Sequence, residues 1–165
     1  MSRLALALCA LLSGCSSQVL RLEPRWAPLV EVVERPALVL SDEASTTLGN
    51  RIYVVDLSGW ERRYPEGSPE REGLLLHEQE HARRQAAAGL GRWLVAYLDD
   101  TDVMWDEERR GWALELRHLQ RSGRPVNPEK IAAILRGYRN LHGRMVSYPA
   151  ALAFVRAVLA GAPDP

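Results

Sequence analysis

His77 and His81 lie four residues apart in a segment whose composition predicts a helix. At about 3.6 residues per turn, this spacing places both imidazoles on one face, where they can bind a single metal ion. Glu78 follows the first histidine and lies about 100° further around the helix. A carboxylate there can take a proton from a water molecule whose pKa zinc lowers toward about 7. The His-Glu-x-x-His pattern therefore predicts Zn²⁺ bound by His77 and His81, with Glu78 as the general base of a hydrolase.

Residues 73–81 read Gly-Leu-Leu-Leu-His-Glu-Gln-Glu-His, and this segment resembles the active-site helix of the zincin metallopeptidases. The resemblance implies a small sheet over that helix, with an edge strand that binds the substrate as an added strand. It also implies that the substrate is a peptide or protein. Over residues 37–121 the resemblance extends only to the order of the elements.

A catalytic zinc site has three protein ligands and an open position, so a third ligand is needed. The metzincin extension is absent, because the positions three and six residues after His81 hold neither the required glycine nor the required histidine. The gluzincin branch instead uses a glutamate on a later helix, often followed three residues on by a small residue. Glu108 and Gly111 match that pattern. We therefore predict Glu108 as the third ligand, with Glu107 and then Glu115 as alternatives.

The sequence does not decide which residues orient the metal-binding histidines or stabilise the oxyanion. A metal-bound histidine usually donates its second N–H to an oxygen, and the candidate carboxylates are Glu115, Asp99 and Asp102. Stabilisation of a developing oxyanion is a common role of a tyrosine or histidine in zincins, and the downstream candidates are Tyr138, His142 and Tyr148.

The elements that must position these residues follow from the hydrophobic pattern. Residues 37–40 and 51–57 are expected to be strands of a small antiparallel sheet, with a turn at 41–50 and a loop at 58–70. Helices are expected over about 70–88, 92–98, 101–121, 128–137 and 147–160, several with a Ser, Asp or Asn cap and a glycine at the end. The fold class is therefore α+β, a small sheet followed by a helical body.

The N-terminus is typical of a lipoprotein signal. Arg3 precedes a short apolar run that is too short to span a bilayer. The ending Leu-Ser-Gly-Cys resembles the lipobox of bacterial lipoproteins, which implies cleavage before Cys15 and lipidation of that cysteine. Residues 1–14 are thus a predicted signal peptide, 15–28 a tether and 29–165 the peptidase domain. The expected location is the bacterial cell envelope, anchored to a membrane through Cys15, with the outer membrane facing the periplasm as one option.

The amino-acid composition argues against several classes of function. The 165 residues hold 21 basic and 21 acidic side chains, a balance that argues against a nucleic-acid partner. Both cysteines precede residue 16, so a cysteine nucleophile or a cysteine-based zinc site in the domain is excluded. The main alternative to a peptidase is a non-catalytic, lipid-anchored envelope protein with a structural or assembly role, whose zincin-like site binds zinc or is degenerate.

Overall fold

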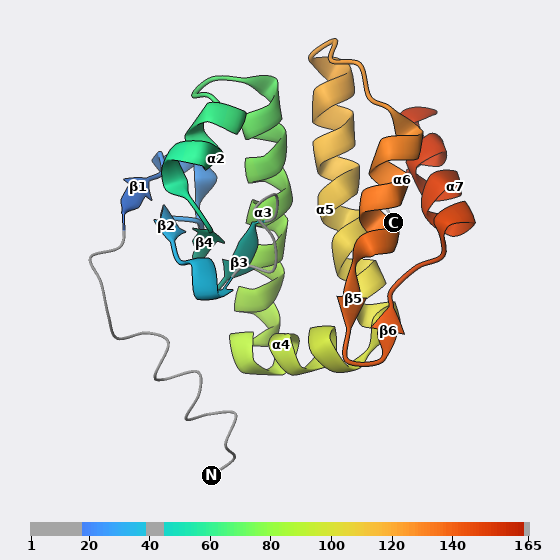
Figure 1. Cartoon of the computed structure of the whole chain (residues 1–165), viewed down its shortest axis with the longest axis horizontal. Helices are drawn as coiled ribbons and strands as arrows, with labels where there is room; N and C mark the ends of the chain where they lie inside the picture. Colours follow the sequence, from blue (N-terminus) through green and yellow to red (C-terminus); the bar gives the residue numbers. More distant parts are fainter. Residues whose placement is uncertain (1–17, 39–44, 164–165) are drawn as a thin grey trace.

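The computed structural model describes residues 18–38 and 45–163 and has the predicted α+β class. A small sheet and helix α2 (Leu57–Arg63) lie against one side of helix α3 (Pro69–Ala88), as Figure 1 shows. Helices α5 (Thr101–Arg121), α6 (Pro128–Gly137) and α7 (Tyr148–Leu159) lie on the other side. Helix α4 (Leu90–Asp99) crosses between the two halves. The long helices α3 and α5 therefore pack against each other at the centre of the molecule.

The sheet is mixed, which corrects the expectation of an antiparallel one. Its order is β1-β2-β4-β3, and the central pair β2–β4 is parallel. The bounds are β1 Val19–Arg21, β2 Glu31–Glu34, β3 Thr46–Leu48 and β4 Arg51–Val54. The chain reverses direction twice between β2 and β4, so these two strands run the same way. Ile52 and Val54 of β4 are almost fully buried, which explains why this apolar strand lies inside the sheet and leaves the edge to β3.

The structure corrects two expectations for the segments that flank the sheet. The expected strand at 37–40 is wrong over its described residues, because Pro36–Leu38 forms a 3-10 turn and the strand is the earlier apolar run. Proline has a fixed φ and no N–H, so it suits the start of a turn. The expected loop at 58–70 contains α2, because Asp56 accepts hydrogen bonds from the backbone N–H groups of Ser58 and Gly59 at 3.1 and 2.9 Å. This cap also ends the preceding strand at Val54.

The predicted boundary between the tether (residues 15–28) and the globular domain lies too late in the sequence. Val19–Arg21 pairs with β2, and Trp26 is buried in the core beneath the sheet. The side-chain amide of Gln79 on α3 donates a 2.7 Å hydrogen bond to the carbonyl of Ala27. The globular domain therefore includes residues 19–28. The predicted signal peptide and Cys15 lie outside the described residues. Within the described part of the chain, no helix is long and apolar enough to cross a membrane.

Two separate hydrophobic cores hold the fold together. One joins the sheet to α2 and the outer face of α3, and the other joins α5, α6 and α7. The side chains of α3 and α5 that meet between these cores are instead buried polar residues, namely His77, His81, Glu107 and Glu108. Burying charged groups is unfavourable unless they are paired or bind a metal. The α3–α5 interface is therefore where a functional site is expected.

Candidate metal centre

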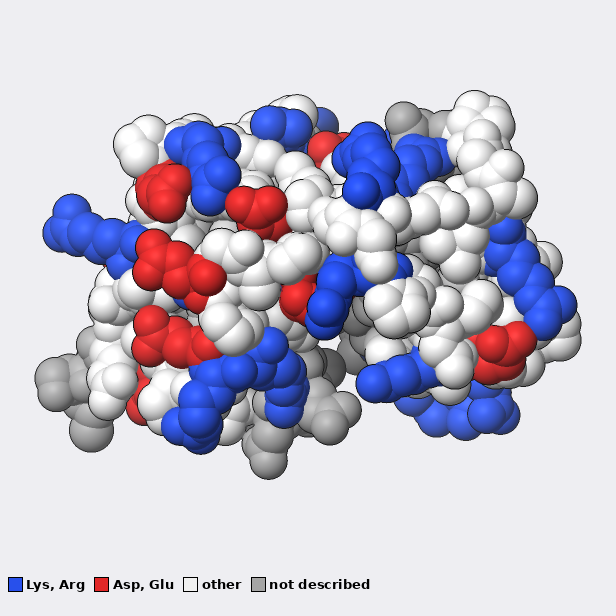
Figure 2. Space-filling view, turned by 90° about the horizontal axis from the view of Figure 1, so that it is seen from above, with Lys and Arg blue, Asp and Glu red and all other residues white. Residues whose placement is uncertain are grey.

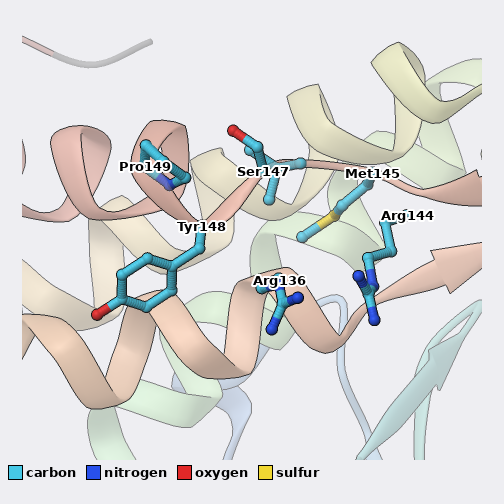
Figure 3. A pocket seen from close by; sticks show the side chains of 7 residues that line it. Arg136, Arg144, Met145, Ser147, Tyr148 and Pro149 are labelled. Atoms are coloured by element: carbon cyan, nitrogen blue, oxygen red, sulfur yellow. The ribbon is translucent and has the colours of Figure 1, made fainter.

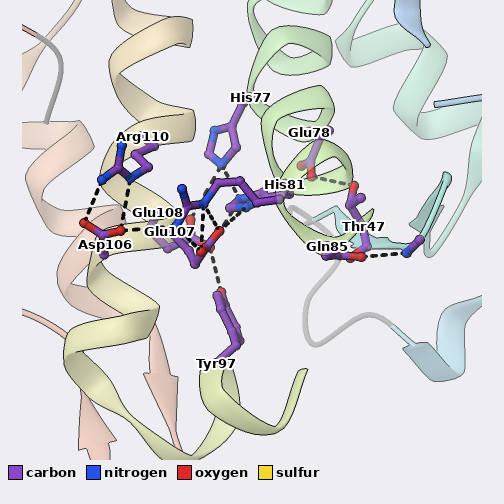
Figure 4. A network of polar contacts seen from close by, with 12 residues as sticks. Thr47, His77, Glu78, His81, Gln85, Tyr97, Asp106, Glu107, Glu108 and Arg110 are labelled. Carbon is purple, nitrogen blue, oxygen red and sulfur yellow. Dashed lines mark hydrogen bonds and ion pairs between the residues drawn. The ribbon is translucent and has the colours of Figure 1, made fainter. Parts of the chain in front are cut away.

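The structure brings His77, His81 and Glu108 together at the α3–α5 interface (Figure 4). The Nε2 atoms of the two histidines are 3.0 Å apart. The Glu108 carboxylate oxygens lie 3.6 Å from Nε2 of His77 and 3.5 Å from Nε2 of His81. All three side chains are buried. The three residues that the sequence predicted as ligands thus form one compact triangle of donor atoms.

These donors fit a tetrahedral zinc ion. Bonds of about 2.0–2.1 Å around a tetrahedral ion place neighbouring donor atoms about 3.3 Å apart. The two Nε2 atoms here are 3.0 Å apart, and each lies 3.5–3.6 Å from one oxygen of the Glu108 carboxylate, Oε2 for His77 and Oε1 for His81. Nδ1 of His77 contacts a carboxylate, so Nε2 is the nitrogen left to bind the ion. Two imidazole nitrogens and one carboxylate also match the chemistry that Zn²⁺ prefers. Hence the residues present suit zinc without any rearrangement of the backbone.

Gly111 allows the two helices to come this close. A Cβ atom at position 111 would lie 2.6 Å from Nε2 and 2.8 Å from Cγ of His77, and closer still to Cδ2. Such contacts are far inside van der Waals distance, so no larger residue fits beside the imidazole. The sequence pattern of Glu108 followed by a small residue at 111 therefore has a direct steric cause in this fold.

Replacing Gly111 by alanine is expected to displace the His77 ring and push α5 away from α3. Over-packing of this kind typically costs about 1–3 kcal/mol, and zinc binding should weaken as well. Gly91→Ala in α4 is the matched control, because no atom lies within 4 Å of its added Cβ. Urea unfolding and a competitive zinc titration of both variants check this. Wild-type zinc affinity in Gly111→Ala would contradict the steric argument.

Two neighbours orient the ligands. Oε2 of Glu115 lies 3.0 Å from Nδ1 of His77, which selects Glu115 from the three candidate partners. The Tyr97 hydroxyl donates a 2.6 Å hydrogen bond to Oε1 of Glu108. Tyr97 escaped the sequence analysis because nothing in the short helix α4 marks it. Its ring stacks on Trp93, which in turn packs edge-on against His81.

Electrostatics favour a neutral tyrosine next to an ionised carboxylate. Burial and the Glu108 charge both raise the pKa of Tyr97 well above its usual value. Burial alone would raise the pKa of Glu108, but the nearby His81 and His77 outweigh it and lower the pKa. Burial also opposes protonation of His77, yet hydrogen bonding to Glu108 and Glu115 raises the pKa of the ring well above 6.5. Without a metal ion, the ionised Glu108 carboxylate is therefore paired with a protonated His77, and a zinc ion would have to displace that proton.

Glu107, the second-ranked ligand candidate, pairs with an arginine and not with the two histidines. Its two oxygens each accept a 2.8 Å hydrogen bond from Nε of Arg84 on α3, and its distance to Nδ1 of His81 is 3.9 Å. Burial raises the pKa of Glu107, but His81 and Arg84 outweigh this and lower the pKa to about 2. The residue thus ties α5 to α3 beside the metal triangle rather than completing it.

Glu107 should make the free energy of unfolding depend on pH in the acidic range. Its pKa is about 2 in the folded chain against an ordinary value of 4.5, so its contribution to stability is complete above 4.5 and is lost as pH falls toward 2. We expect Glu107→Gln to be less stable than the wild type at about pH 6, with a smaller difference at about pH 3. Urea unfolding of the zinc-free proteins at both pH values measures this. A difference that does not change with pH would contradict the assignment.

Glu78 lies on the sheet side of α3, away from Glu108 (Figure 4). Its Oε2 accepts a 2.6 Å hydrogen bond from the hydroxyl of Thr47, and both residues are buried. Thr47 belongs to the edge strand β3. One turn beyond His81, the buried Gln85 side chain donates to the Thr47 carbonyl at 2.8 Å and accepts from the Gly49 N–H at 2.6 Å. These contacts hold β3 against the helix, with Thr47 directly on the predicted base.

The three candidates for oxyanion stabilisation lie in different surroundings. Burial raises the pKa of Tyr138 well above its usual value, and the charges of Glu108, Glu78 and Glu115 raise it further. His142 is instead exposed and contacts Asp99 at 2.8 Å. Tyr148 lines a pocket at the start of α7, shown in Figure 3. Of the three, Tyr138 is the one whose pKa is raised by the carboxylates of the site.

Comparison of the chain with protein-family models, with curated proteins and with solved structures gave no match. The resemblance to zincins therefore depends on residues 73–81 and on the contacts just described.

Proposed function

We propose that the chain is a zinc-dependent metallopeptidase of the gluzincin type. The observation that carries this proposal is the buried triangle of His77, His81 and Glu108, with the carboxylate of Glu78 on the same helix turn. Two histidines and a glutamate leave one of four positions free, as catalytic zinc sites do. A purely structural zinc site usually has four protein ligands, and no fourth His, Cys, Asp or Glu joins this group in the described part of the chain.

Each residue of the site has its own role in the proposed hydrolysis. A zinc ion held by His77, His81 and Glu108 would supply Lewis acidity and lower the pKa of water. Glu78 takes the proton from the attacking water and passes it to the leaving amine. Thr47 donates a hydrogen bond to one oxygen of Glu78, which leaves the other oxygen free for that proton. Glu115 and Tyr97 fix the orientation of His77 and Glu108.

One observation favours the non-catalytic alternative. The residues His77, Glu78, His81 and Glu108 are each no more than 6% exposed. A peptide reaches such a site only after β3 or its surroundings move. A lipid-anchored envelope protein that holds zinc without turnover would need no such opening. The retained base at Glu78, held in place by Thr47, supports the enzyme instead.

The proposed setting is the bacterial envelope. The signal and lipobox pattern ending at Cys15 supports a membrane-tethered protein. With β1 beginning at Val19, three residues separate Cys15 from the first strand. A substrate would then be a peptide or protein close to the membrane surface.

Zinc-dependent proteolysis is the direct test. We expect the zinc-loaded chain to cleave unfolded casein or members of a peptide library, with products identified by mass spectrometry. Removal of zinc by a chelator should abolish cleavage, and added zinc should restore it. A folded chain with about one bound zinc and no cleavage of any peptide would favour the non-catalytic alternative. A folded chain that binds no zinc would exclude the peptidase and leave only a non-catalytic protein with a degenerate site.

A further inference from the structure

The C-terminal part of the chain concentrates basic side chains without acidic ones. Residues 130–163 contain no aspartate or glutamate but five basic residues, Lys130, Arg136, Arg139, Arg144 and Arg156. In a chain whose charges balance overall, this segment is therefore strongly positive. On the face seen in Figure 2, acidic side chains gather mainly over the half that carries the sheet.

A short hairpin places two of these arginines opposite each other. Strands β5 (Arg139–Asn140) and β6 (Gly143–Arg144) are antiparallel, and Arg139 pairs in register with Arg144. Like charges directly opposite on a strand pair are destabilising. By contrast, Arg156 in the same segment is neutralised by Glu129 at 2.8 Å. The hairpin therefore keeps a repulsion that an external anion would relieve.

Arg144 and Arg136 both line an open pocket of about 760 Å³ in front of α7 (Figure 3). Ser147 and Tyr148, at the start of that helix, form another part of its wall. Neither guanidinium pairs with a carboxylate of the described residues. Guanidinium groups bind phosphate oxygens through two parallel hydrogen bonds. Two of them facing one hollow make phosphate the ligand that this pocket fits best.

Exposed aliphatic side chains lie beside this basic site. Leu141, in the turn of the hairpin, is 78% exposed. Its backbone N–H donates a 3.1 Å hydrogen bond to the carbonyl of Leu98 on α4, a helix that also exposes Val95. The hairpin and α4 lie together at one end of the molecule in Figure 1. Basic residues beside exposed aliphatic residues are typical of surfaces that bind an anionic lipid bilayer.

We propose that the pocket of Arg136 and Arg144 binds the phosphate of an anionic phospholipid headgroup, with Leu141 inserted into the bilayer interface. The carboxylate of Asp99 contacts His142 at 2.8 Å, and no ion pair among the described residues joins it to either arginine. This site is independent of the zinc centre. It would fix which end of the domain faces the membrane, a property that a flexible lipid anchor alone does not give.

Vesicle binding tests the proposal on residues 16–165, which contain every described element but neither the apolar run of the predicted signal peptide nor Cys15, so that neither can anchor the chain. We expect it to co-sediment with vesicles that contain phosphatidylglycerol and much less with pure phosphatidylcholine. The Arg136→Ala/Arg144→Ala variant should bind roughly thirty-fold more weakly, since each arginine near an anionic surface contributes about a factor of five. Leu141→Ser should weaken vesicle binding several-fold. Circular dichroism confirms that each variant is folded.

The matched control is Arg83→Ala/Arg121→Ala, which removes the same charge from exposed positions on α3 and α5. An equal loss in this control would mean diffuse attraction rather than a pocket, and would overturn the proposal. Inorganic phosphate, titrated by NMR, separates the two sources of phosphate. Phosphate binding that depends on both arginines, without vesicle binding, would make this a free-phosphate site and exclude the lipid. Absence of both kinds of binding would exclude the site altogether.

Discussion

Glu78→Gln should abolish peptide hydrolysis while the chain still binds zinc. Loss of a general base typically lowers the rate by about 10²–10⁴-fold. The amide has the same shape as the carboxylate and can still accept the hydrogen bond from Thr47, so the fold should persist. Its side chain is not one of the three predicted ligands, so zinc content should stay near one per chain. Activity and zinc content, measured on the same preparation, check both halves of this result.

Glu80→Gln is the matched control for this experiment. It makes the same chemical change on α3, two residues away, at a position that is only half-buried and outside the metal triangle. Its activity should equal that of the wild type. If Glu78→Gln kept wild-type activity, the proposed mechanism would be wrong, whatever the metal content. If it lost zinc, Glu78 would instead be a ligand.

Glu108→Ala should cause the largest loss of zinc affinity among the three candidate glutamates. Removal of a residue that only orients a ligand typically costs 10–100-fold in metal affinity, and removal of a direct ligand should cost more. Glu115→Ala is therefore expected to fall in the 10–100-fold range, because Glu115 contacts His77 and not the ion. Glu107→Gln should bind zinc almost normally, since its carboxylate is occupied by Arg84.

A competitive titration with a chromophoric chelator measures all three affinities. Stability must be followed in parallel, because Glu108→Ala also leaves the Tyr97 hydroxyl without its acceptor. Tyr97→Phe controls for that effect, since it removes the hydrogen bond but retains the carboxylate. A ranking in which Glu107 mattered most would reassign the third ligand.

Local spacing predicted the metal triangle because both parts of it are local patterns. His77 and His81 are one helical turn apart, and Glu108 is paired with the small residue Gly111 that its approach requires. The histidine spacing follows from helix geometry alone, whereas the choice of Glu108 followed from the resemblance to gluzincins. The choice of Glu115 as the partner of His77 did require the structure, because the sequence offered three carboxylates of equal merit.

Contacts made across the fold could not be predicted in this way. Thr47 lies in a segment rich in turn-forming residues, and it forms a strand because its neighbour β4 is buried and needs a partner on that side. Gln85 and Tyr97 are ordinary helical residues whose roles come only from what lies opposite them. The sheet was misjudged for the same reason, since its parallel pair joins residues about 20 positions apart.

The separation of the two hydrophobic cores has a consequence for cooperativity. Each core is complete on its own side, and the groups between them are charged or polar. A bound cation that takes ligands from both α3 and α5 would add to the polar contacts that already join the two halves, such as the Glu107–Arg84 pair, and would couple their unfolding more tightly. If the chain binds zinc as proposed, the supply of the metal would then help to decide whether the two halves unfold together and how readily the chain is degraded.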